Sequence, residues 1–217
     1  MLTAYWAAKG GAGATVLAAA HALVASTRRA TVVVDLDGDL PAALGVEATD
    51  RPGVADWLRA GPDVPADALD RLLVPVADDL LLLPRGSGAL DDGRAAVLGR
   101  LLADSPREVV VDAGTRPVGA ARDVVRQADR SVLVTRACYL ALRRLHGIGL
   151  APTEVALVRE ANRALGGADV TAAVGVPVRT TVGVDPGIAR AVDAGLLATR
   201  LPRSLARAAT AAGGIDR

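Results

Sequence analysis

Phenylalanine is absent from this sequence, and its only aromatic residues are two tryptophans and two tyrosines. The core must therefore consist of leucine, valine and alanine, and a surface that stacks single-stranded bases on aromatic rings is disfavoured. The single cysteine, Cys138, excludes an internal disulfide and a metal site that needs several cysteines of one chain. Because hydrophobic residues still make up 51% of the chain, the composition is that of a folded protein and not of a disordered one.

Long apolar runs are also missing. No run approaches the roughly 18 residues that span a bilayer. The first predicted strand begins at residue 2, which leaves no room for a signal peptide, so we expect the protein in the cytoplasm. A length of 217 residues suits one α/β domain over residues 1–217, with a core of ordinary size.

Lysine is nearly absent: 24 of the 25 basic residues are arginine, and the single lysine is Lys9. It opens the run KGGAGAT at residues 9–15. A slim ammonium side chain fits a crowded phosphate pocket that a wide guanidinium does not. The run lies between a predicted strand at 2–8 and a predicted helix at 15–25, the order of a phosphate-binding loop. The alternative is a glycine-rich turn with an incidental lysine.

The end of this loop departs from the standard pattern. A Walker A loop ends in Gly-Lys-Ser/Thr, whereas this chain has Gly13-Ala14-Thr15. Losing one charged hydrogen bond costs about 1.5–3 kcal/mol, or about 10- to 150-fold in affinity, which nucleotide binding can survive. Losing a donor to the transition state costs about 10²–10³ in rate. We therefore expect slow or absent hydrolysis, and a weak ATPase at most.

Acidic residues follow two of the predicted strands. Asp35, Asp37 and Asp39 come at and after the strand at 31–36, and Asp112 follows the strand at 108–111. Ligands bind at the carboxyl ends of parallel strands, so these acids should meet the glycine loop. In a P-loop fold Asp112 would lie beside Mg²⁺ and Asp37 would orient an attacking water. The alternatives are a helix cap for Asp112 and an ordinary Asp-Gly turn for Asp37.

Strand-like and helix-like runs alternate along the chain, which predicts an α/β fold with a mostly parallel central sheet and helices on both faces. The predicted strands cover residues 2–8, 31–36, 80–83, 108–111, 131–135, 154–158 and 176–182. The predicted helices cover residues 15–25, 53–60, 66–73, 91–103, 118–128, 137–146, 186–194 and 204–212. We expect His21 on a helix surface or satisfied, and Cys138 as a buried small apolar residue.

Charge is unevenly distributed between the two halves. Residues 1–112 carry 16 acids and 10 bases, which is −6, and residues 113–217 carry 8 acids and 15 bases, which is +7. The basic half predicts a surface for DNA, anionic lipid or an acidic partner, against the alternative that each half only solvates itself. Near the C-terminus, arginines lie opposite a short apolar stripe. That pattern fits a helix on a membrane surface or a last helix packed on the core.

These motifs together resemble the ParA/MinD group of P-loop ATPases along nearly the whole chain. KGGAGAT resembles the group's deviant Walker A loop, whose signature lysine comes first, and VVVDAG resembles its Walker B segment. VVVDLDGDLPAALG is similar to the second motif, and TVGVDPGIARAVDAG to the late loop and helix near the adenine. Within the group, the sequence is most similar to the CpaE/TadZ proteins of Tad pilus assembly and the actinobacterial septum-site-determining proteins, which often lack the loop lysine.

The resemblance implies ATP and Mg²⁺ as ligands and a homodimer in which Lys9 reaches the partner's nucleotide. It implies Lys9 and Asp37 as catalytic residues, and Thr15, Asp37 and Asp112 at the metal. The implied nucleotide-binding residues are Lys9, Gly10, Gly11, Ala12, Gly13, Ala14, Thr15, Val16, Asp185 and Pro186. One departure is Arg159-Glu160, where the group carries an Asn-Arg pair for the base.

The implied function is a dimerising switch that positions a cellular machine, namely a pilus or secretion apparatus, a division site or a cargo. Its implied location is the cytoplasm or the inner face of the cell membrane, with a protein partner in the apparatus and DNA or anionic membrane as the surface it contacts. The alternative is a pseudo-ATPase scaffold that keeps the fold and the partner surface without nucleotide turnover.

Overall fold

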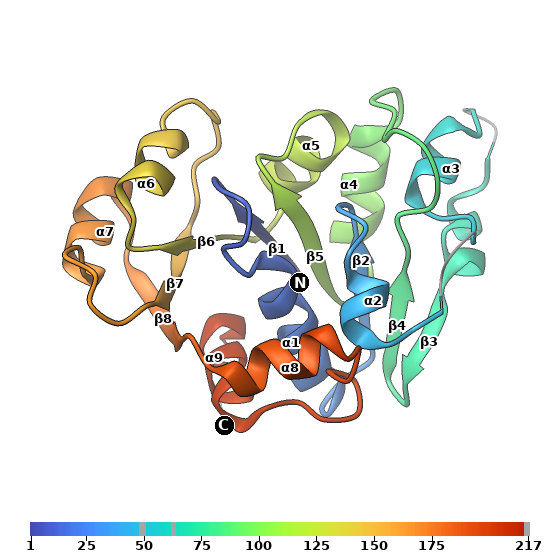
Figure 1. Cartoon of the computed structure of the whole chain (residues 1–217). Coiled ribbons are helices and arrows are strands. Elements are labelled where there is room, and N and C mark those ends of the chain that lie inside the picture. The colour runs from blue at the N-terminus through green and yellow to red at the C-terminus, as the bar shows by residue number, and fades with distance from the viewer. Residues whose placement is uncertain (48–50, 62–63, 215–217) are drawn as a thin grey trace.

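The computed structural model describes residues 1–47, 51–61 and 64–214 (Figure 1). The strands are β1 (Leu2–Ala7), β2 (Thr31–Asp35), β3 (Val74–Ala77), β4 (Leu80–Leu83), β5 (Glu108–Thr115), β6 (Arg130–Arg136), β7 (Glu154–Arg159) and β8 (Val178–Gly183). The helices are α1 (Ala14–Ser26), α2 (Leu40–Leu44), α3 (Val54–Arg59), α4 (Ala95–Ala103), α5 (Gly119–Gln127), α6 (Tyr139–Leu145), α7 (Gly167–Val174), α8 (Pro186–Asp193) and α9 (Arg203–Gly213).

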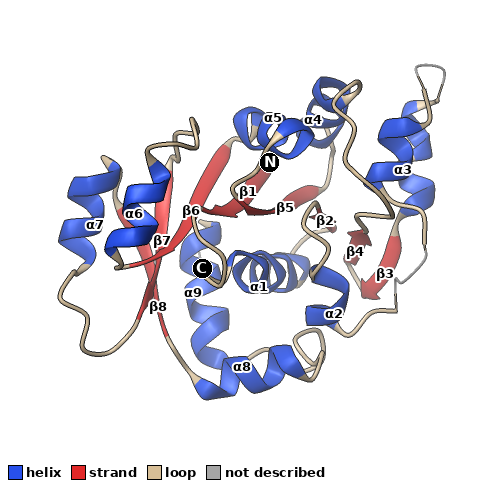
Figure 2. Cartoon of the chain, turned by 45° about the horizontal axis from the view of Figure 1, so that its top comes forward, coloured by secondary structure: helices blue, strands red, loops and turns tan. Residues whose placement is uncertain are grey.

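These strands form one sheet in the order β3-β4-β2-β5-β1-β6-β7-β8. All neighbouring strands pair in parallel except β3 and β4, which are antiparallel. Helices cover both faces (Figure 2). The predicted mostly parallel α/β sheet is thus confirmed. In the described part of the chain, no helix is long and apolar enough to cross a membrane.

The central strands are buried on both faces, which is why they read as continuous apolar runs. Trp6 points to the face covered by α3, α4 and α5, whereas its neighbour Tyr5 points to the face covered by α1, α8 and α9. In register, Asp112 on β5 lies opposite Tyr5 on β1 and opposite Asp35 on β2. The carboxyl ends of these three strands therefore finish level with one another, at the edge from which the glycine loop leaves β1.

The C-terminal helix packs on the core, one of the two predicted alternatives. The apolar side of α9 is buried against α1 through Leu205, Ala208, Ala209 and Ala212. Most of the buried residues of α1 are alanines, which lets the two helices approach closely. No apolar face of α9 is left to insert into a bilayer.

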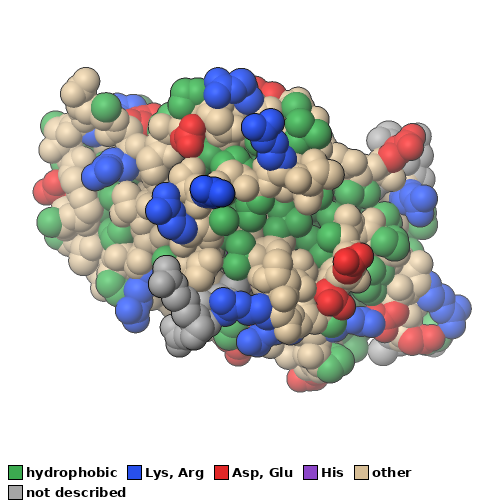
Figure 3. All heavy atoms as spheres, turned by 90° about the horizontal axis from the view of Figure 1, so that it is seen from below, with side chains coloured by type: hydrophobic (Ala, Val, Ile, Leu, Met, Phe, Trp, Pro, Cys, Tyr) green, Lys and Arg blue, Asp and Glu red, His purple; other side chains and the backbone are tan. Residues whose placement is uncertain are grey.

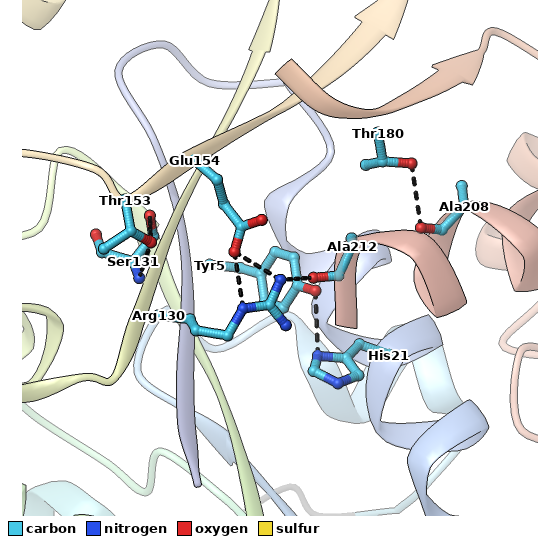
Figure 4. A network of polar contacts seen from close by, with 9 residues as sticks. All are labelled: Tyr5, His21, Arg130, Ser131, Thr153, Glu154, Thr180, Ala208 and Ala212. Atoms are coloured by element: carbon cyan, nitrogen blue, oxygen red, sulfur yellow. Dashed lines mark hydrogen bonds and ion pairs between the residues drawn. The ribbon is translucent and has the colours of Figure 1, made fainter. Parts of the chain in front are cut away.

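A buried polar network also ties α1 and α9 to the sheet (Figure 4). The Tyr5 hydroxyl lies 3.1 Å from His21 Nδ1, and both side chains are fully buried. Arg130 Nε donates to Glu154 Oε1 at 2.8 Å, and Arg130 Nη2 donates to the carbonyl oxygen of Ala212 at the end of α9. Burial lowers the pKa of His21 to about 3, so the ring is neutral near pH 7.

Several predicted elements differ from the observed ones. Residues 66–73 form two 3₁₀ turns, Ala66–Ala68 and Asp70–Leu72, and not a continuous helix. Helix α4 starts at Ala95 because the two preceding acids serve other groups: Asp91 accepts from Gly93 N, and Asp92 accepts from Ala120 N at the start of α5. Strand β3 and helices α2 and α7 were not predicted from the sequence. Each is short, and proline or glycine lies within or beside it.

Candidate functional site

The loop between β1 and α1 is shaped as an anion cradle. Gly11 has a φ of 71° and Gly13 a φ of 96°, a region in which a side chain is strained. Helix α1 has no side-chain cap and no acid in its first turn, and the N–H groups of residues 14–16 donate to no acceptor in the described chain. A Cβ added to Gly11 would meet nothing within 4 Å. The free backbone donors thus face open space, which suits a phosphate.

A hollow of about 560 Å³, here called the loop hollow, opens over this cradle. Its floor is residues 10–16, and its walls are Asp37, Asp39 and α2 on one side, Gly114 and Thr115 on another, and the end of α8 on a third. A second hollow of about 200 Å³, the side hollow, shares residues 11–13 and the end of α8 with it. It continues along mainly apolar side chains at the ends of β7 and β8. The pair offers a polar compartment for phosphates beside a more apolar one for a base.

Two carboxylates lie buried beneath the loop hollow. Asp35 Oδ1 accepts hydrogen bonds from the N–H groups of Asp37 at 3.1 Å and Gly38 at 2.7 Å, and Asp112 Oδ1 accepts from Gly114 N–H at 3.1 Å. The Oδ2 atom of each has no partner. Burial raises the pKa of Asp35 to about 6 and that of Asp112 to about 7, while the nearby Thr15 hydroxyl opposes the shift of Asp112.

These residues fit a Mg²⁺ ion that arrives with a nucleotide. Within the described ranges, no group of three or more His, Cys, Asp or Glu side chains could hold a metal ion by itself. Mg²⁺, however, usually keeps several waters and binds one or two carboxylates together with substrate phosphates. The Thr15 hydroxyl and the unpartnered Oδ2 of Asp112 are suitable ligands of that kind, directly or through water.

Asp37 lies at the mouth of the loop hollow and is exposed. Its carboxylate packs on Gly114, where an added Cβ would come within 2.2 Å of Asp37 Oδ1. Partial burial raises the pKa of Asp37, the neighbouring Asp39 adds to the rise, and Arg85 opposes it. The carboxylate is thus held at the entrance, where it can accept a proton or orient a water.

The remaining predicted site residues are spread around the loop. Asp185 lines the side hollow, and it also caps α8, because Oδ1 accepts from Gly187 N at 2.7 Å and Oδ2 accepts from Ser204 Oγ at 3.0 Å. Lys9, Pro186 and Asp112 line neither hollow. Hydrogen bonds from the backbone N–H groups of Ala141 and Leu140 lower the pKa of the Cys138 thiol, and the charge of the half-buried Lys9 contributes to the same shift. Cys138 itself is half-buried at the start of α6 and not buried as predicted.

Two features of the site were not predicted from the sequence. Arg136, at the end of β6, lines the side hollow, and its Nη1 pairs with Glu160 Oε1 at 2.5 Å. Arg163 Nε binds the other oxygen of Glu160 at 2.5 Å, so two guanidinium groups hold the acid that replaces part of the expected base-contact pair. The sequence signal that could have revealed this pair is a charged residue at the end of β6 and another directly after β7.

The second missed feature is a contact between α2 and α8, the helices that wall the loop hollow. A Cβ on Gly45, at the end of α2, would lie 2.0 Å from the carbonyl oxygen of Gly195, which follows α8. A Cβ on Gly195 would lie 3.0 Å from the carbonyl oxygen of Ala42. Both glycines have positive φ, so the two turns meet backbone to backbone.

A strand, an uncapped glycine loop, a helix and buried aspartates on neighbouring parallel strands together define the α/β fold of the P-loop NTPases. Among these, the fold matches that of ParA and MinD proteins. The ParA family ATPase of Chlorobium tepidum is similar with a TM-score of 0.80 and 20% identity, over 96% of this chain and 95% of that one. MinD of Pyrococcus horikoshii, solved with Mg-ADP, has a TM-score of 0.80 and 19% identity, over 100% and 97%.

MinD of Aquifex aeolicus, solved in a MinC:MinD complex, has a TM-score of 0.79 and 17% identity, over 99% of this chain and 94% of that one. At these identities the likeness is one of fold. No protein-family model matches the sequence, and no curated protein matches it either.

Proposed function

We propose that this chain is an ATP-binding, ParA/MinD-like switch that dimerises around nucleotide and positions a cellular machine. The machine would be a pilus or secretion apparatus of the CpaE/TadZ type, a division site or another cargo. Residues 1–217 would act as one nucleotide-binding domain. The observation that carries the proposal is the uncapped loop at residues 9–15, open to a hollow and placed over the unpartnered Oδ2 of Asp112.

Each part of the site would have one task. Backbone N–H groups of the loop would bind the phosphates, and the Thr15 hydroxyl with Asp112 would hold Mg²⁺, which neutralises phosphate charge when bound. Asp37, held against Gly114, would orient a water at the mouth of the loop hollow. Because position 14 is alanine, the loop has no ammonium group there to stabilise the charge that develops on the terminal phosphate in the transition state. Hydrolysis would therefore be slow or absent.

A dimer over the nucleotide edge is supported by the apolar side chains exposed there. Val118 and Tyr139 are each 67% exposed, Val184 is 61% exposed and Leu140 is 50% exposed. These residues follow β5, β6 and β8, whose carboxyl ends share an edge with the glycine loop. Apolar residues gathered at one edge mark a surface for another protein. A second copy there would place its Lys9 at the first copy's nucleotide, since Lys9 lines neither hollow of its own chain.

Arginines on and between α8 and α9 support a second contact, with DNA or an anionic membrane. Arg190, Arg200 and Arg203 line a hollow of about 500 Å³, the arginine hollow. The lower face of the molecule shows Lys and Arg side chains at several places, with Asp and Glu side chains among them (Figure 3). All three arginines of the arginine hollow are exposed, and none forms an ion pair within the described residues. Because the apolar side of α9 is buried, contact with a membrane would depend on charge alone. The protein would act in the cytoplasm or at the inner face of the cell membrane.

Calorimetric titration with ATP, ADP and GTP, each with Mg²⁺, tests the central proposal. We expect Mg-ATP to bind and to raise the melting temperature. Thr15→Ala is the matched control, because it removes the hydroxyl and leaves the loop backbone intact, so it should weaken binding only when Mg²⁺ is present. No heat and no stabilisation at millimolar nucleotide would leave the pseudo-ATPase scaffold as the function.

A further inference from the structure

Arg85 lies in none of the motifs assigned to the nucleotide site, yet its backbone is held firmly. It lies just beyond β4, where the first turn of α3 binds the chain: Val54 N donates to the carbonyl oxygen of Pro84 at 2.9 Å, and Ala55 N donates to that of Arg85 at 2.8 Å. The approach is close enough that a Cβ on Gly53 would come within 2.1 Å of the Pro84 oxygen. The N-terminus of one helix therefore fixes the position of this arginine.

The side chain of Arg85 lies beside the turn that follows β2, next to Asp37 and Gly38. Its Cδ lies 3.7 Å from the point where a Cβ on Gly38 would stand. Its charge acts on the adjacent Asp37 carboxylate, which itself lines the loop hollow. Among the described residues the guanidinium forms no ion pair, and its one hydrogen bond, from Nη1 to the Gly86 oxygen at 3.5 Å, is at the outer limit of such contacts. The guanidinium is therefore available to a stronger partner.

The loop hollow itself lacks positive charge. Its lining includes Asp37, Asp39 and Asp193 but no lysine or arginine, and the loop has Ala14 where an ammonium would stand. A bound triphosphate would bring further negative charge to this place. Backbone donors and Mg²⁺ would neutralise part of that charge, and the terminal phosphate, which carries the most charge, would be the part in greatest need of a further cation.

We propose that Arg85 supplies, within the same chain, the cation that Ala14 omits, and that it binds the terminal phosphate of a nucleoside triphosphate held in the loop hollow. The inference rests on the proposed nucleotide binding. A guanidinium presents a planar fork to phosphate oxygens, which gives strong paired hydrogen bonds. The protein would use it to distinguish a nucleoside triphosphate from a diphosphate.

The test compares the affinities of Mg-ADP and of Mg²⁺ with a non-hydrolysable ATP analogue, by calorimetry. In Arg85→Ala we expect the analogue to bind about 10- to 150-fold more weakly, while the affinity for ADP is unchanged. Arg100→Ala, an exposed arginine of α4 without an ion pair in the described chain, is the matched control and should change neither affinity. Arg85→Ala combined with Ala14→Lys should recover the lost affinity for the analogue.

The outcomes separate this inference from the function on which it rests. If the wild type binds both nucleotides and Arg85→Ala changes both affinities equally, or neither, the role of Arg85 is wrong while nucleotide binding stands. If the wild type binds neither nucleotide, both proposals fail. Arg85→Gln keeps the stem and removes the charge, so it gives the same ratio of affinities if Arg85→Ala does not fold.

Discussion

Lys9 is the only ammonium side chain in the protein, and it stands beside the hollow that it was predicted to serve. Its half-buried position near Cys138 and α6 places it at the edge that also exposes Tyr139 and Leu140. In the proposed dimer, a side chain at this edge would face the second copy.

If Lys9 acts across a dimer, Lys9→Ala should weaken ATP-dependent dimerisation more than it weakens nucleotide binding by the monomer. Lys9→Arg should be nearly as harmful, because the guanidinium fork is too wide for a slot that a lysine fills. Sedimentation with and without Mg-ATP measures the first effect, and calorimetry the second. Normal dimerisation of Lys9→Arg would mean that the lone lysine is an accident of composition.

His21 makes stability depend on acid. Its pKa is about 3 in the folded protein, against an ordinary 6.5 in the unfolded chain, because burial disfavours the charged ring. At pH values between 3 and 6.5, the unfolded chain binds a proton on His21 that the folded chain does not bind. The free energy of unfolding is therefore highest, with respect to His21, above pH 6.5, and it falls as the pH drops below that value. His21→Gln should remove this part of the pH dependence.

Urea denaturation of the wild type and His21→Gln at pH 7 and pH 5 isolates this contribution. We expect the wild type to lose about 2 kcal/mol more than the variant between the two conditions. The raised pKa values of Asp35 and Asp112 act in the opposite direction, but they are common to both proteins and cancel in the comparison. Equal losses in the two proteins would contradict the assignment.

At the scale of elements, the central strands could be predicted because each is an apolar run bounded by loop residues. The proximity of Thr15, Asp37 and Asp112 could also be predicted, because the carboxyl ends of parallel strands lie at one edge of the sheet. The contacts of Arg85 could not be predicted, because they join segments far apart in the chain, and the only signal for Arg136 was its place at the end of a strand. Short elements such as α2 and β3 take their conformation from neighbours, and their local sequence argues against it.

Arg130 joins Glu154 to the end of α9, and this contact gives a prediction at the scale of elements. Breaking the Arg130–Glu154 pair leaves a buried charge, since these side chains are only 19% and 8% exposed. We expect Glu154→Gln to lower the free energy of unfolding by about 3 kcal/mol and to speed amide exchange at the end of α9. Asp67→Asn breaks the exposed Arg71–Asp67 pair, and should cost less than about 1 kcal/mol. Similar losses of unfolding free energy in the two variants would show that burial does not strengthen the Arg130–Glu154 pair.

At the scale of the whole molecule, the loop hollow and the arginine hollow differ in charge. Acids line the loop hollow, whereas Arg190, Arg200 and Arg203, which form no ion pair in the described part of the chain, line the arginine hollow. Helix α8 belongs to both, because Asp193 lines the loop hollow while Arg190 lines the arginine hollow. One helix therefore links the two surfaces that the proposed function requires.

Replacing Arg190, Arg200 and Arg203 with glutamate should weaken binding to duplex DNA without loss of stability. Their removal should reduce the slope of log affinity against log salt by about 3, one unit for each arginine that no longer neutralises a phosphate. Replacing Arg71, Arg100 and Arg126 with glutamate makes the same change in net charge elsewhere and is the control. Equal loss in both triple variants would mean that overall charge, and not this surface, attracts the polyanion; binding only to anionic vesicles would favour the membrane.

The contact between the turns after α2 and α8 has a consequence for the evolution of the sequence. Neither Gly45 nor Gly195 can gain a side chain while the other turn stays in place, since a Cβ on Gly45 would stand 2.0 Å from the Gly195 oxygen. Two positions distant in the gene are thus under one constraint. A lineage that preserves the narrow junction should retain both glycines, and one that loses either should show a lengthened or redirected turn at the other.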